Sequence, residues 1–421
     1  NKKEDNNIIN NFEEDRYVFI SYIDYSYLKG KDENILKEEI NKMVLNIKEN
    51  NFNGIILQVR AFSDAIYYSK IFSPSLYIVN NENDKLKLDM LDYFIKLSHE
   101  NNIKLIAWIN PYRIRSNNDI SSISGNNIVN KYLNTSSVEI KNGIYFNPAK
   151  DEVLDLIIKG VLEIVKNYDV DGILYDDYFY PSKTCDLNDY KLYKLNGGLK
   201  SLEDFRRDNI NKLIRKTYEK IKEVNSDVLF GISPSGNMNN NYNAEYLDIN
   251  YLIENKIVDF IMPQIYYGFD NTNLPFVNTV NSWSNLVKDT NIKFYVALAL
   301  YKSGLEDKYA KTGINEWINN NDIISKQIIV SRNTYNYEGF SIFRYDYLFN
   351  SKKDNKQLLD EVFYVKKLLK NIIKLKNAKY RDEEGLFIVE GPHLVKEAKM
   401  AGVLKEAYTI DERYDGELVS I

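Results

Sequence analysis

Residues 168–181 read Tyr-Asp-Val-Asp-Gly-Ile-Leu-Tyr-Asp-Asp-Tyr-Phe-Tyr-Pro, an apolar run that leads directly into two adjacent carboxylates. The run Val170 to Tyr175 has the composition of a buried strand, and Asp176 and Asp177 follow at its end. Carboxylates are costly to bury, so a pair at this position indicates either acid–base chemistry or a structural hydrogen-bond node. The rest of the sequence helps to decide between the two.

The central run is one of eight strand-like runs in the chain. They span residues 17–23, 54–59, 104–109, 170–175, 228–232, 258–262, 293–300 and 339–343. Segments of helical periodicity lie between them, including 32–50, 151–167 and 202–224. The alternation predicts an α/β fold, a (β/α)₈ TIM barrel with a small C-terminal α/β appendage. A doubly wound sheet is the alternative, but no Gly-rich phosphate turn follows the first run.

Turn residues and functional residue types separate to opposite ends of the predicted strands. Gly54, Asp171, Asp259 and Gly339 lie at the N-terminal ends, where a structural turn role is expected. Polar and aromatic residues follow the C-terminal ends, where the loops of a barrel enzyme build its active site. The sequence therefore predicts a site at the C-terminal mouth of the barrel.

Side-chain alternation along a strand selects candidates for this site. If Gly172 and Leu174 face the lumen, Asp176 does so too, at the mouth. Asp177 then points aside, unless the chain turns there, as the following Tyr-Phe-Tyr-Pro suggests. Asp176 is the first candidate for catalysis and Asp177 the second. The alternative is that both carboxylates cap loop amides.

The same alternation brings further polar and aromatic side chains to the strand ends. Asn, Gln, Arg and Tyr can hold sugar hydroxyls and N-acetyl groups, and Trp and Tyr can stack on pyranose rings. The candidates are Gln58, Arg60, Trp108, Asn110, Gln264 and Tyr266, with Asp64, Arg113, Ser233, Asn237 and Asp346 as weaker ones. Each has an alternative role in packing or structural hydrogen bonding, but their concentration at one rim favours a ligand site.

The residue inventory excludes several classes of site. The 421 residues contain one cysteine, Cys185, and two histidines, of which His99 is expected to be solvated. A disulfide, a cysteine-cluster metal site, a Ser-His-Asp triad and a His-rich zinc site are therefore not expected, and neither is a cofactor. A net charge of −5 argues against nucleic-acid binding by the barrel. No apolar run reaches the ~18 residues of a membrane span.

Several motifs in order resemble one family. They are Gln-Val-Arg-Ala-Phe-Ser-Asp-Ala-Ile-Tyr-Tyr-Ser (58–69), Ala-Trp-Ile-Asn-Pro-Tyr-Arg (107–113), Tyr-Phe-Asn-Pro (145–148), the central stretch, Gly-Ile-Ser-Pro-Ser-Gly (231–236) and Pro-Gln-Ile-Tyr-Tyr (263–267). Over residues 16–350 they look like the glycosyl-hydrolase-like family ten of bacterial surface enzymes and lipoproteins. The resemblance implies a TIM-barrel glycosidase that acts on peptidoglycan or another N-acetylated glycan, as a hydrolase or a lytic transglycosylase. It adds Tyr112 to the substrate-binding candidates and implies a secreted or surface-attached protein whose leader is removed.

A fainter likeness to chitinase-like family eighteen glycosidases concerns the acid. Asp171-Gly172-Ile173 and Asp176 match their strand-four signature, but Tyr178 stands where those enzymes carry a glutamate. Cleavage of a glycosidic bond needs a protonated carboxyl and usually a second carboxylate, and the seventh strand, 293–300, ends without one. We therefore expect Asp176 to be the acid, with a raised pKa, while the N-acetyl group or the muramic 6-hydroxyl of the substrate attacks.

The C-terminal end differs from the barrel in composition. A lysine-rich amphipathic helix is predicted within 351–376, as a linker that follows a barrel domain at 15–350. Residues 366–421, with Lys379-Tyr380-Arg381 and a strand at 386–390, are similar to the start of the substrate-binding domain of SpoU-type RNA ribose methyltransferases. That family's catalytic domain is absent, so no methyltransferase activity is expected. We interpret 377–421 as a partial domain from a fusion, or as an appendage on the barrel, and 1–14 as a disordered tail.

The sequence leaves two other functions open. A catalytically inactive barrel that anchors to cell-wall glycan would share the same rim of Tyr, Trp and Asn. It would differ from an enzyme in whether the pKa of Asp176 is raised. An RNA-modifying protein is the third interpretation, and it would need a basic face that the net charge does not favour.

Overall fold

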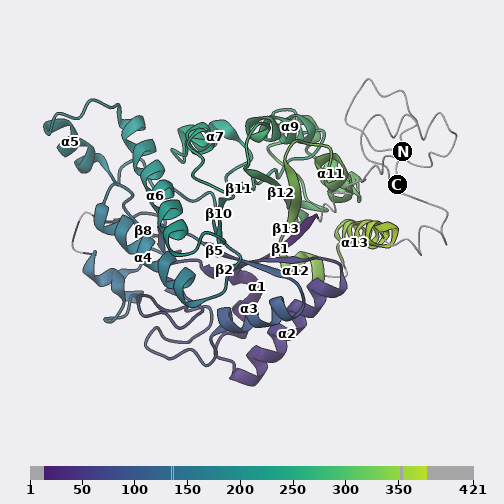
Figure 1. Cartoon of the computed structure of the whole chain (residues 1–421), viewed down its shortest axis with the longest axis horizontal. Helices are drawn as coiled ribbons and strands as arrows, with labels where there is room; N and C mark the ends of the chain where they lie inside the picture. The colour runs from purple at the N-terminus through teal and green to yellow at the C-terminus, as the bar shows by residue number, and fades with distance from the viewer. Residues whose placement is uncertain (1–13, 134, 136, 351–353, 377–421) are drawn as a thin grey trace, which may run out of the picture.

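The structure is a computed structural model that describes residues 14–133, 135, 137–350 and 354–376 (Figure 1). The predicted fragment at 377–421, and the predicted tail at 1–14 except for its last residue, lie outside the described residues.

Eight parallel strands close into a barrel in chain order. They are β1 (Asp15–Ile20), β2 (Gly54–Arg60), β5 (Lys104–Ile109), β9 (Gly172–Tyr175), β10 (Leu229–Ile232), β11 (Phe260–Ile261), β12 (Lys293–Ala299) and β13 (Tyr337–Phe343). The predicted TIM barrel is therefore confirmed, and the doubly wound sheet is not the fold. The first strand was expected to run to residue 23, but it ends earlier because Ser21 and Asp24 form a capping box that starts a helix.

Helices cover the outside of the barrel (Figure 1). The outer helices are α2 (Glu33–Glu49), α3 (Met90–Glu100), α4 (Asp151–Asn167), α6 (Leu202–Val224), α8 (Ile249–Glu254), α9 (Phe276–Val287), α11 (Ile323–Ser331) and α13 (Lys356–Lys376). In α4, Val153, Ile157, Val161 and Ile164 recur at helical spacing and are buried. This amphipathic spacing explains why the segment forms a helix against the sheet.

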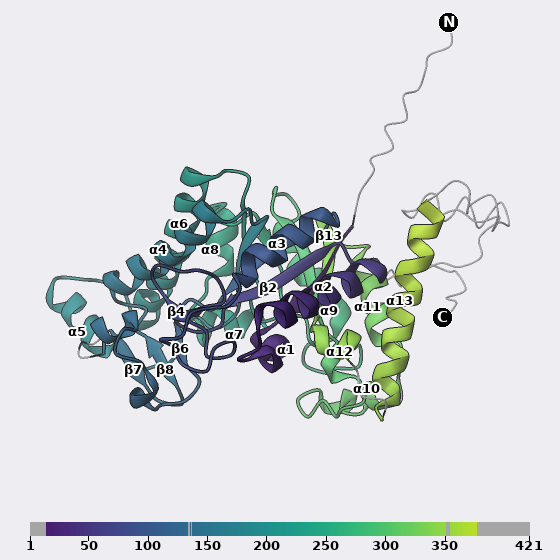
Figure 2. The same ribbon diagram turned by 90° about the horizontal axis from the view of Figure 1, so that it is seen from below.

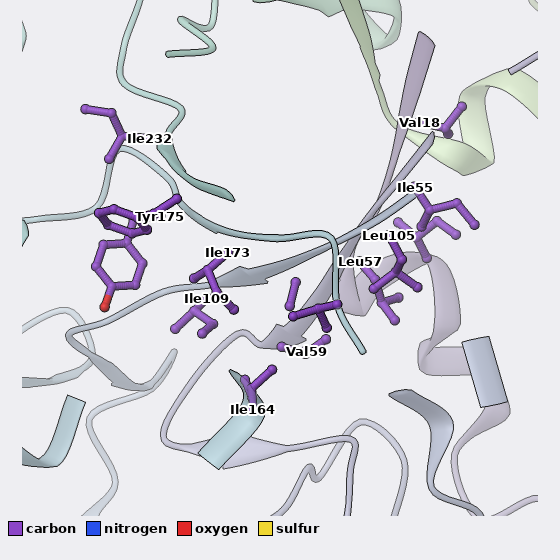
Figure 3. Packing of buried hydrophobic residues seen from close by; sticks show 14 of the residues in the cluster. Val18, Ile55, Leu57, Val59, Leu105, Ile109, Ile164, Ile173, Tyr175 and Ile232 are labelled. Carbon is purple, nitrogen blue, oxygen red and sulfur yellow. The ribbon is translucent and has the colours of Figure 1, made fainter. Parts of the chain in front are cut away.

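Two apolar layers lie on the two sides of the strands. Phe19, Ile56, Ile106 and Leu174 belong to a cluster that fills the lumen. Their chain neighbours, among them Ile55, Leu57, Ile173 and Tyr175, belong to the outer core between the strands and the helices (Figure 3). The predicted alternation of strand 170–175 is thus confirmed. Asp176 is the next even-numbered position after Leu174, so the alternation directs it toward the lumen.

Short elements after the strands build the mouth. Two small sheets, β3 (Asp64–Ala65) with β4 (Ser73–Pro74) and β6 (Arg113–Arg115) with β8 (Ile144–Phe146) and β7 (Val138–Ile140), follow β2 and β5. The short helices are α1 (Tyr22–Tyr25), α5 (Leu187–Leu195), α7 (Met238–Asn243), α10 (Glu316–Asn319), α12 (Tyr345–Phe349), η1 (Ser26–Leu28), η2 (Ile120–Ser122), η3 (Ile128–Lys131), η4 (Leu300–Lys302) and η5 (Lys311–Gly313). Figure 2 shows α1, α10 and α12 on the same side of the barrel.

The helix predicted within 351–376 is present as α13, and it packs on the barrel wall beside α11 (Figures 1 and 2). Leu358, Val362, Val365 and Leu369 are buried in the contact. The carboxylate of Glu361 accepts hydrogen bonds from the N–H groups of residues 323 and 324, at 2.6 and 3.0 Å, and so caps the start of α11. The first four turns of α13 therefore belong to the barrel's apolar core.

His99 contacts the other end of the barrel rather than solvent alone. Its Nε2 lies 3.0 Å from Oδ2 of Asp171, which also accepts the N–H of Leu105 at 2.6 Å. The expectation that His99 is solvated therefore holds only in part: its side chain is 33% exposed, and Asp171, just before β9, contacts its ring. Asp171 has the structural role that its position predicts.

Among the described residues, none of the helices combines the length and apolar character needed to cross a membrane.

Candidate active site

The site is built where β9 ends. Asp176 directly follows the strand and is 3% exposed, whereas the Tyr178 side chain is 57% exposed at the surface. The parallel register pairs Trp108 with Leu174 and Ile109 with Tyr175, so β5 brings its own C-terminal residues beside Asp176. On the other side, the N–H of Ser233 donates to the carbonyl of Tyr175 at 2.7 Å and continues the contact with β10.

Asp176 lies at the end of a hydrogen-bond relay across three strands. Its Oδ2 accepts from Nε1 of Trp108 at 3.1 Å and from Nδ2 of Asn110. Nε2 of Gln58 donates to Oδ1 of Asn110 at 2.6 Å, which fixes the orientation of that amide. Oδ1 of Asp176 accepts the N–H of Tyr178 at 3.3 Å. The relay brings together four of the residues that the sequence predicts for the mouth.

The environment raises the pKa of Asp176 to about 7. Burial is the largest cause, followed by the charge of Asp177, and together they outweigh the opposing effects of Arg113 and of the hydrogen bonds to Tyr178 and Trp108. Burial also raises the pKa of Asp177, against the hydrogen bond from Gln264 and the charge of Arg113. Because burial raises both pKa values, the pair keeps a proton to higher pH than two solvent-exposed carboxyls would.

Gln264 and Ser233 support the second carboxyl. Nε2 of Gln264 donates to Oδ1 of Asp177 at 3.1 Å and to the carbonyl of Ser233 at 3.0 Å. Ser233 is fully buried, and its Oγ has no hydrogen-bond partner within the described part of the chain. The backbone carbonyl of Ser233 thus helps to orient the Gln264 amide.

Aromatic rings and the guanidinium of Arg113 line the mouth. The guanidinium of Arg113 lies 4.4 Å from the ring centre of Phe62 and 5.1 Å from that of Tyr178. The ring of Tyr266 lies 6.0 Å from Phe343 and 5.9 Å from Tyr301. Such rings present apolar faces of the kind on which sugars stack, so Arg113 and Tyr266 are placed as predicted.

The structure places Arg60 elsewhere. It is 1% exposed, its guanidinium lies 3.7 Å from the ring centre of Phe72, and it abuts Gly160 of α4. The prediction that alternation carries Arg60 to the mouth is wrong, because the register shifts between Gln58 and Arg60. One extra residue at such an irregularity sends the following side chain to the opposite face.

Asp64 and Tyr112 have structural contacts within the chain. Asp64 is buried, accepts the N–H of Phe62 at 3.1 Å and pairs with Ser73 through the short β3–β4 ladder. Tyr112 is 2% exposed and packs in the outer core. Asp64 and Tyr112 are therefore buried behind the rim and do not line it.

Asn237 and Asp346 act at helix starts. Oδ1 of Asn237 accepts the N–H groups of Asn239 and Asn240, at 3.0 and 3.2 Å, and caps α7. Asp346, in the first turn of α12, forms an ion pair of 3.0 Å with Arg344. These contacts match the capping and structural alternatives that the sequence left open.

One acidic residue beside the site has no signal in the sequence. Glu245 follows α7, and its Oε2 accepts the N–H groups of Phe179 and Tyr180, at 3.3 and 3.5 Å. Burial, and then the charge of Asp177, raise the pKa of Glu245 to about 7. It lies in an Asn-rich loop and not at the end of a strand, so only the folded chain brings it to β9.

Within the part of the chain that the structure describes, no group of three or more His, Cys, Asp or Glu side chains could hold a metal ion. The acids of the site accept hydrogen bonds from amide, indole and backbone N–H groups, which stabilise the ionised form of each carboxyl.

Comparison with known proteins gives two family matches. The model of the family described as Glycosyl hydrolase-like 10 matches residues 15–312. The model described as MRM3-like substrate binding domain matches residues 366–418. Both agree with the resemblances drawn from the motifs. The second match begins inside α13, whose earlier turns pack on the barrel.

Relatives and solved structures agree with the first match. The chain is 31% identical over 300 residues to Glycosyl hydrolase YngK of Bacillus subtilis, covering 66% of this chain and 59% of YngK. It is 30% identical over 322 residues to Glycosyl hydrolase DigH of Escherichia coli strain K12, covering 70% of this chain and 72% of DigH. The chain thus spans about three fifths of the length of YngK.

The solved structures show the fold alone. The glycoside hydrolase domain of PgaB (BpsB) from Bordetella bronchiseptica has a TM-score of 0.51 and 10% identity, covering 83% of this chain and 99% of that chain. A β-galactosidase from Bacillus circulans has a TM-score of 0.56 and 9% identity, covering 86% and 56%. Both are TIM-barrel neighbours of this chain.

Proposed function

Because the chain belongs to the glycosyl hydrolase-like 10 family, we propose that it cleaves the glycan strands of peptidoglycan, as a hydrolase or a lytic transglycosylase, with Asp176 as the general acid. The family and its relatives support a glycosidase-type function. The substrate and the acid are the proposal.

One observation carries it: a buried carboxyl at the end of β9 whose pKa is about 7 and whose neighbour is a second carboxyl. A glycosidase needs an acid that still holds its proton near neutral pH, and enzymes obtain such acids by burial and by like charges. A glycan-binding barrel without activity has no use for a proton held in this way. The raised pKa of Asp176 therefore favours the enzyme over the inactive barrel.

The proposed reaction uses the groups that surround Asp176. The glycosidic C–O bond breaks while the leaving oxygen takes the proton of Asp176. Trp108 and Asn110 hold the carboxyl in place, and their N–H groups stabilise the carboxylate that remains. In its ionised form Asp177, held by Gln264, stabilises the positive charge that develops on the sugar ring.

The attacking group comes from outside the pair. β12 ends at Ala299 and is followed by Leu300 and Tyr301, so the seventh barrel strand supplies no acid. The N-acetyl oxygen of the sugar, followed by water, or the muramic 6-hydroxyl bonds to the anomeric carbon. The proton that the incoming hydroxyl or water loses returns to Asp176, which restores the acid.

We also propose that the protein works outside the cytoplasm, secreted or attached to the cell surface, because its proposed substrate lies there. Its partner is peptidoglycan or another N-acetylated glycan, and the barrel binds no nucleic acid. A net charge of −5 supports the latter point.

Mass spectrometry of purified peptidoglycan, incubated with the wild type or with Asp176→Asn, tests the proposal. New anhydro-muramic ends with the wild type alone identify a lytic transglycosylase, and new reducing ends identify a hydrolase. Intact glycan that retains the protein in a pull-down supports the inactive barrel instead. A folded Asp176→Asn variant with full activity contradicts the role of Asp176.

A further inference from the structure

The loop after α7 holds the loop after β9. Oε2 of Glu245 accepts the N–H groups of Phe179 and Tyr180, 3.3 and 3.5 Å away, two and three residues after Asp177. β9 itself ends at Tyr175, so no barrel ladder bonds hold these two amides. A single carboxyl from another strand's loop thus satisfies two backbone donors at the turn that carries Asp177.

The residue next to Glu245 ties the same two loops together. The ring of Tyr246 lies edge-on to the ring of Tyr180, with centres 4.9 Å apart. The hydroxyl of Tyr246 accepts from Arg206 at 2.9 Å, and Arg206 forms a buried ion pair of 2.8 Å with Asp186. Asp186 in turn accepts the hydroxyl of Tyr180 at 2.7 Å. The position of Glu245 is therefore fixed by a closed network.

The backbone conformation of Tyr246 also supports a fixed position for Glu245. Its φ is 53°, a left-handed conformation that non-glycine residues seldom adopt. Strained backbone persists where the surrounding contacts enforce it, and such residues gather at functional sites. Here the contacts of Tyr246 with Tyr180 and Arg206 enforce a turn that directs the preceding side chain, Glu245, at the β9 loop.

We propose that Glu245 is a positioning residue for Asp177: by holding the N–H groups of Phe179 and Tyr180, it fixes the turn that presents the Asp177 carboxyl and the Tyr178 ring to the glycan. The role rests on the proposed function. It acts through the backbone, because the atoms that Glu245 contacts are the two amides.

The ionisation of Glu245 is compatible with this role. Burial and the negative Asp177 raise the pKa of Glu245 to about 7, so below that pH the Glu245 side chain is mostly neutral. A neutral carboxyl still accepts the two N–H groups through an oxygen, and it adds no second negative charge beside Asp177. The arrangement therefore holds the loop whether the Glu245 carboxyl is neutral or charged.

The test compares Glu245→Ala, which removes the acceptor, with Glu245→Gln, which keeps an oxygen acceptor. At pH 6 we expect Glu245→Ala to lower kcat by about 10- to 100-fold with KM within about threefold, since misplaced groups lose transition-state contacts. Glu245→Gln should keep kcat within about threefold of the wild type. A loss of stability alone would produce neither the rescue by Gln nor a fall in kcat at nearly constant KM.

Glu361 supplies the matched control. It too accepts two consecutive backbone N–H groups, of residues 323 and 324, and it too has a pKa raised to about 7, but it lies on α13 at the outer wall. Glu361→Ala should lower the melting temperature and leave kcat unchanged. If Glu245→Ala keeps the wild-type kcat, or if Glu361→Ala lowers kcat as much, the positioning role is wrong.

A second readout separates this inference from the proposed function. Amide hydrogen exchange at Phe179 and Tyr180 should accelerate in Glu245→Ala and stay slow in Glu245→Gln. If the wild type cleaves no glycan, the proposed function fails, and unchanged exchange in Glu245→Ala then overturns the holding role separately. Should Glu245→Ala not fold, Glu245→Asp replaces it, because its shorter side chain withdraws the acceptor and should lose kcat and protection alike.

Discussion

At the scale of the residue, Asp176 keeps its proton near neutral pH because burial and the charge of Asp177 both disfavour its ionised form. Arg113 opposes them from its place between Phe62 and Tyr178. The balance between one cation and two acids therefore sets the pH range in which the pair holds a single proton.

Replacing Arg113 by Gln should move the pH profile of activity upward. Arg113 lowers the pKa of both Asp176 and Asp177, so its removal raises both. Asp176 then stays protonated above pH 7, and Asp177 needs a higher pH to ionise, so both limbs of kcat/KM shift to higher pH. Arg113→Lys keeps the charge and serves as the control, whose limbs should stay in place. Unmoved limbs in Arg113→Gln would show that its charge does not act on the pair.

The same residues show which parts of the site a sequence can predict. Strand alternation is local, so it placed Leu174 in the lumen and Asp176, Trp108, Asn110 and Gln58 at one rim. A register shift between neighbouring strands is not visible in either strand alone, so alternation predicts the wrong face for Arg60. Glu245 comes to β9 only through the contacts of Tyr246, which depend on residues far apart in the chain.

At the scale of the element, the register shift between Gln58 and Arg60 turns the Arg60 side chain outward, where it contacts α4. A Cβ added at Gly160 would lie 2.2 Å from Nη1 of Arg60 and 2.6 Å from the ring of Phe72. The absence of a side chain at position 160 is therefore what admits a buried guanidinium between the strand and the helix. Helix propensity alone would favour alanine at this position.

Gly160→Ala should therefore destabilise the protein, by about 1–3 kcal/mol, despite the better helix propensity of alanine. The measurement is the free energy of unfolding in urea. Gly125→Ala is the matched control, because a Cβ there meets no atom within 4 Å, and its stability should change little. A Gly160→Ala protein as stable as the wild type would mean that Arg60 and Phe72 move aside at no cost.

The contact between α13 and α11 makes a second prediction at this scale, for pH. Burial raises the pKa of Glu361 from 4.5 to about 7 in the folded protein. The folded state then binds the proton more tightly than the unfolded state, so this group's contribution to stability is full below pH 4.5 and is lost as the pH rises to 7.

Glu361→Gln removes that ionisation. Between pH 4.5 and 8, the unfolding free energy of the wild type should fall by roughly 3 kcal/mol relative to that of Glu361→Gln. In this difference the pH-dependent contributions of the other buried acids cancel, because both proteins contain them. A difference that does not depend on pH would show that Glu361 ionises alike in both states.

At the scale of the whole molecule, the barrel extends beyond the part that the family model matches. The match ends at residue 312, yet β13 (Tyr337–Phe343) closes the barrel between β12 and β1, and α13 covers α11. The eight strand-like runs predicted the closure, because each run is continuous in the sequence. The docking of α13 was not predicted, since its apolar positions alone do not specify which surface covers them.

Truncation locates the end of the barrel domain. A chain that ends at residue 376 should keep the activity and melting temperature of the full chain, because α13 remains complete. A chain that ends at residue 355 loses Leu358, Val362, Val365 and Leu369, four side chains buried against the wall. Each contributes about 1.5–3 kcal/mol of burial, so their sum is comparable with the whole net stability of a domain, about 5–15 kcal/mol.

The shorter chain should therefore be unfolded or aggregate at 37 °C, which thermal melts and gel filtration of the two truncations reveal. If it melts at the temperature of the full chain, α13 is a linker that the barrel does not need, and the boundary lies before it. If the longer chain loses activity as well, the segment after residue 376 contributes to the barrel's function. The predicted result instead makes α13 the last element of the glycosidase domain, although the second family match begins within it.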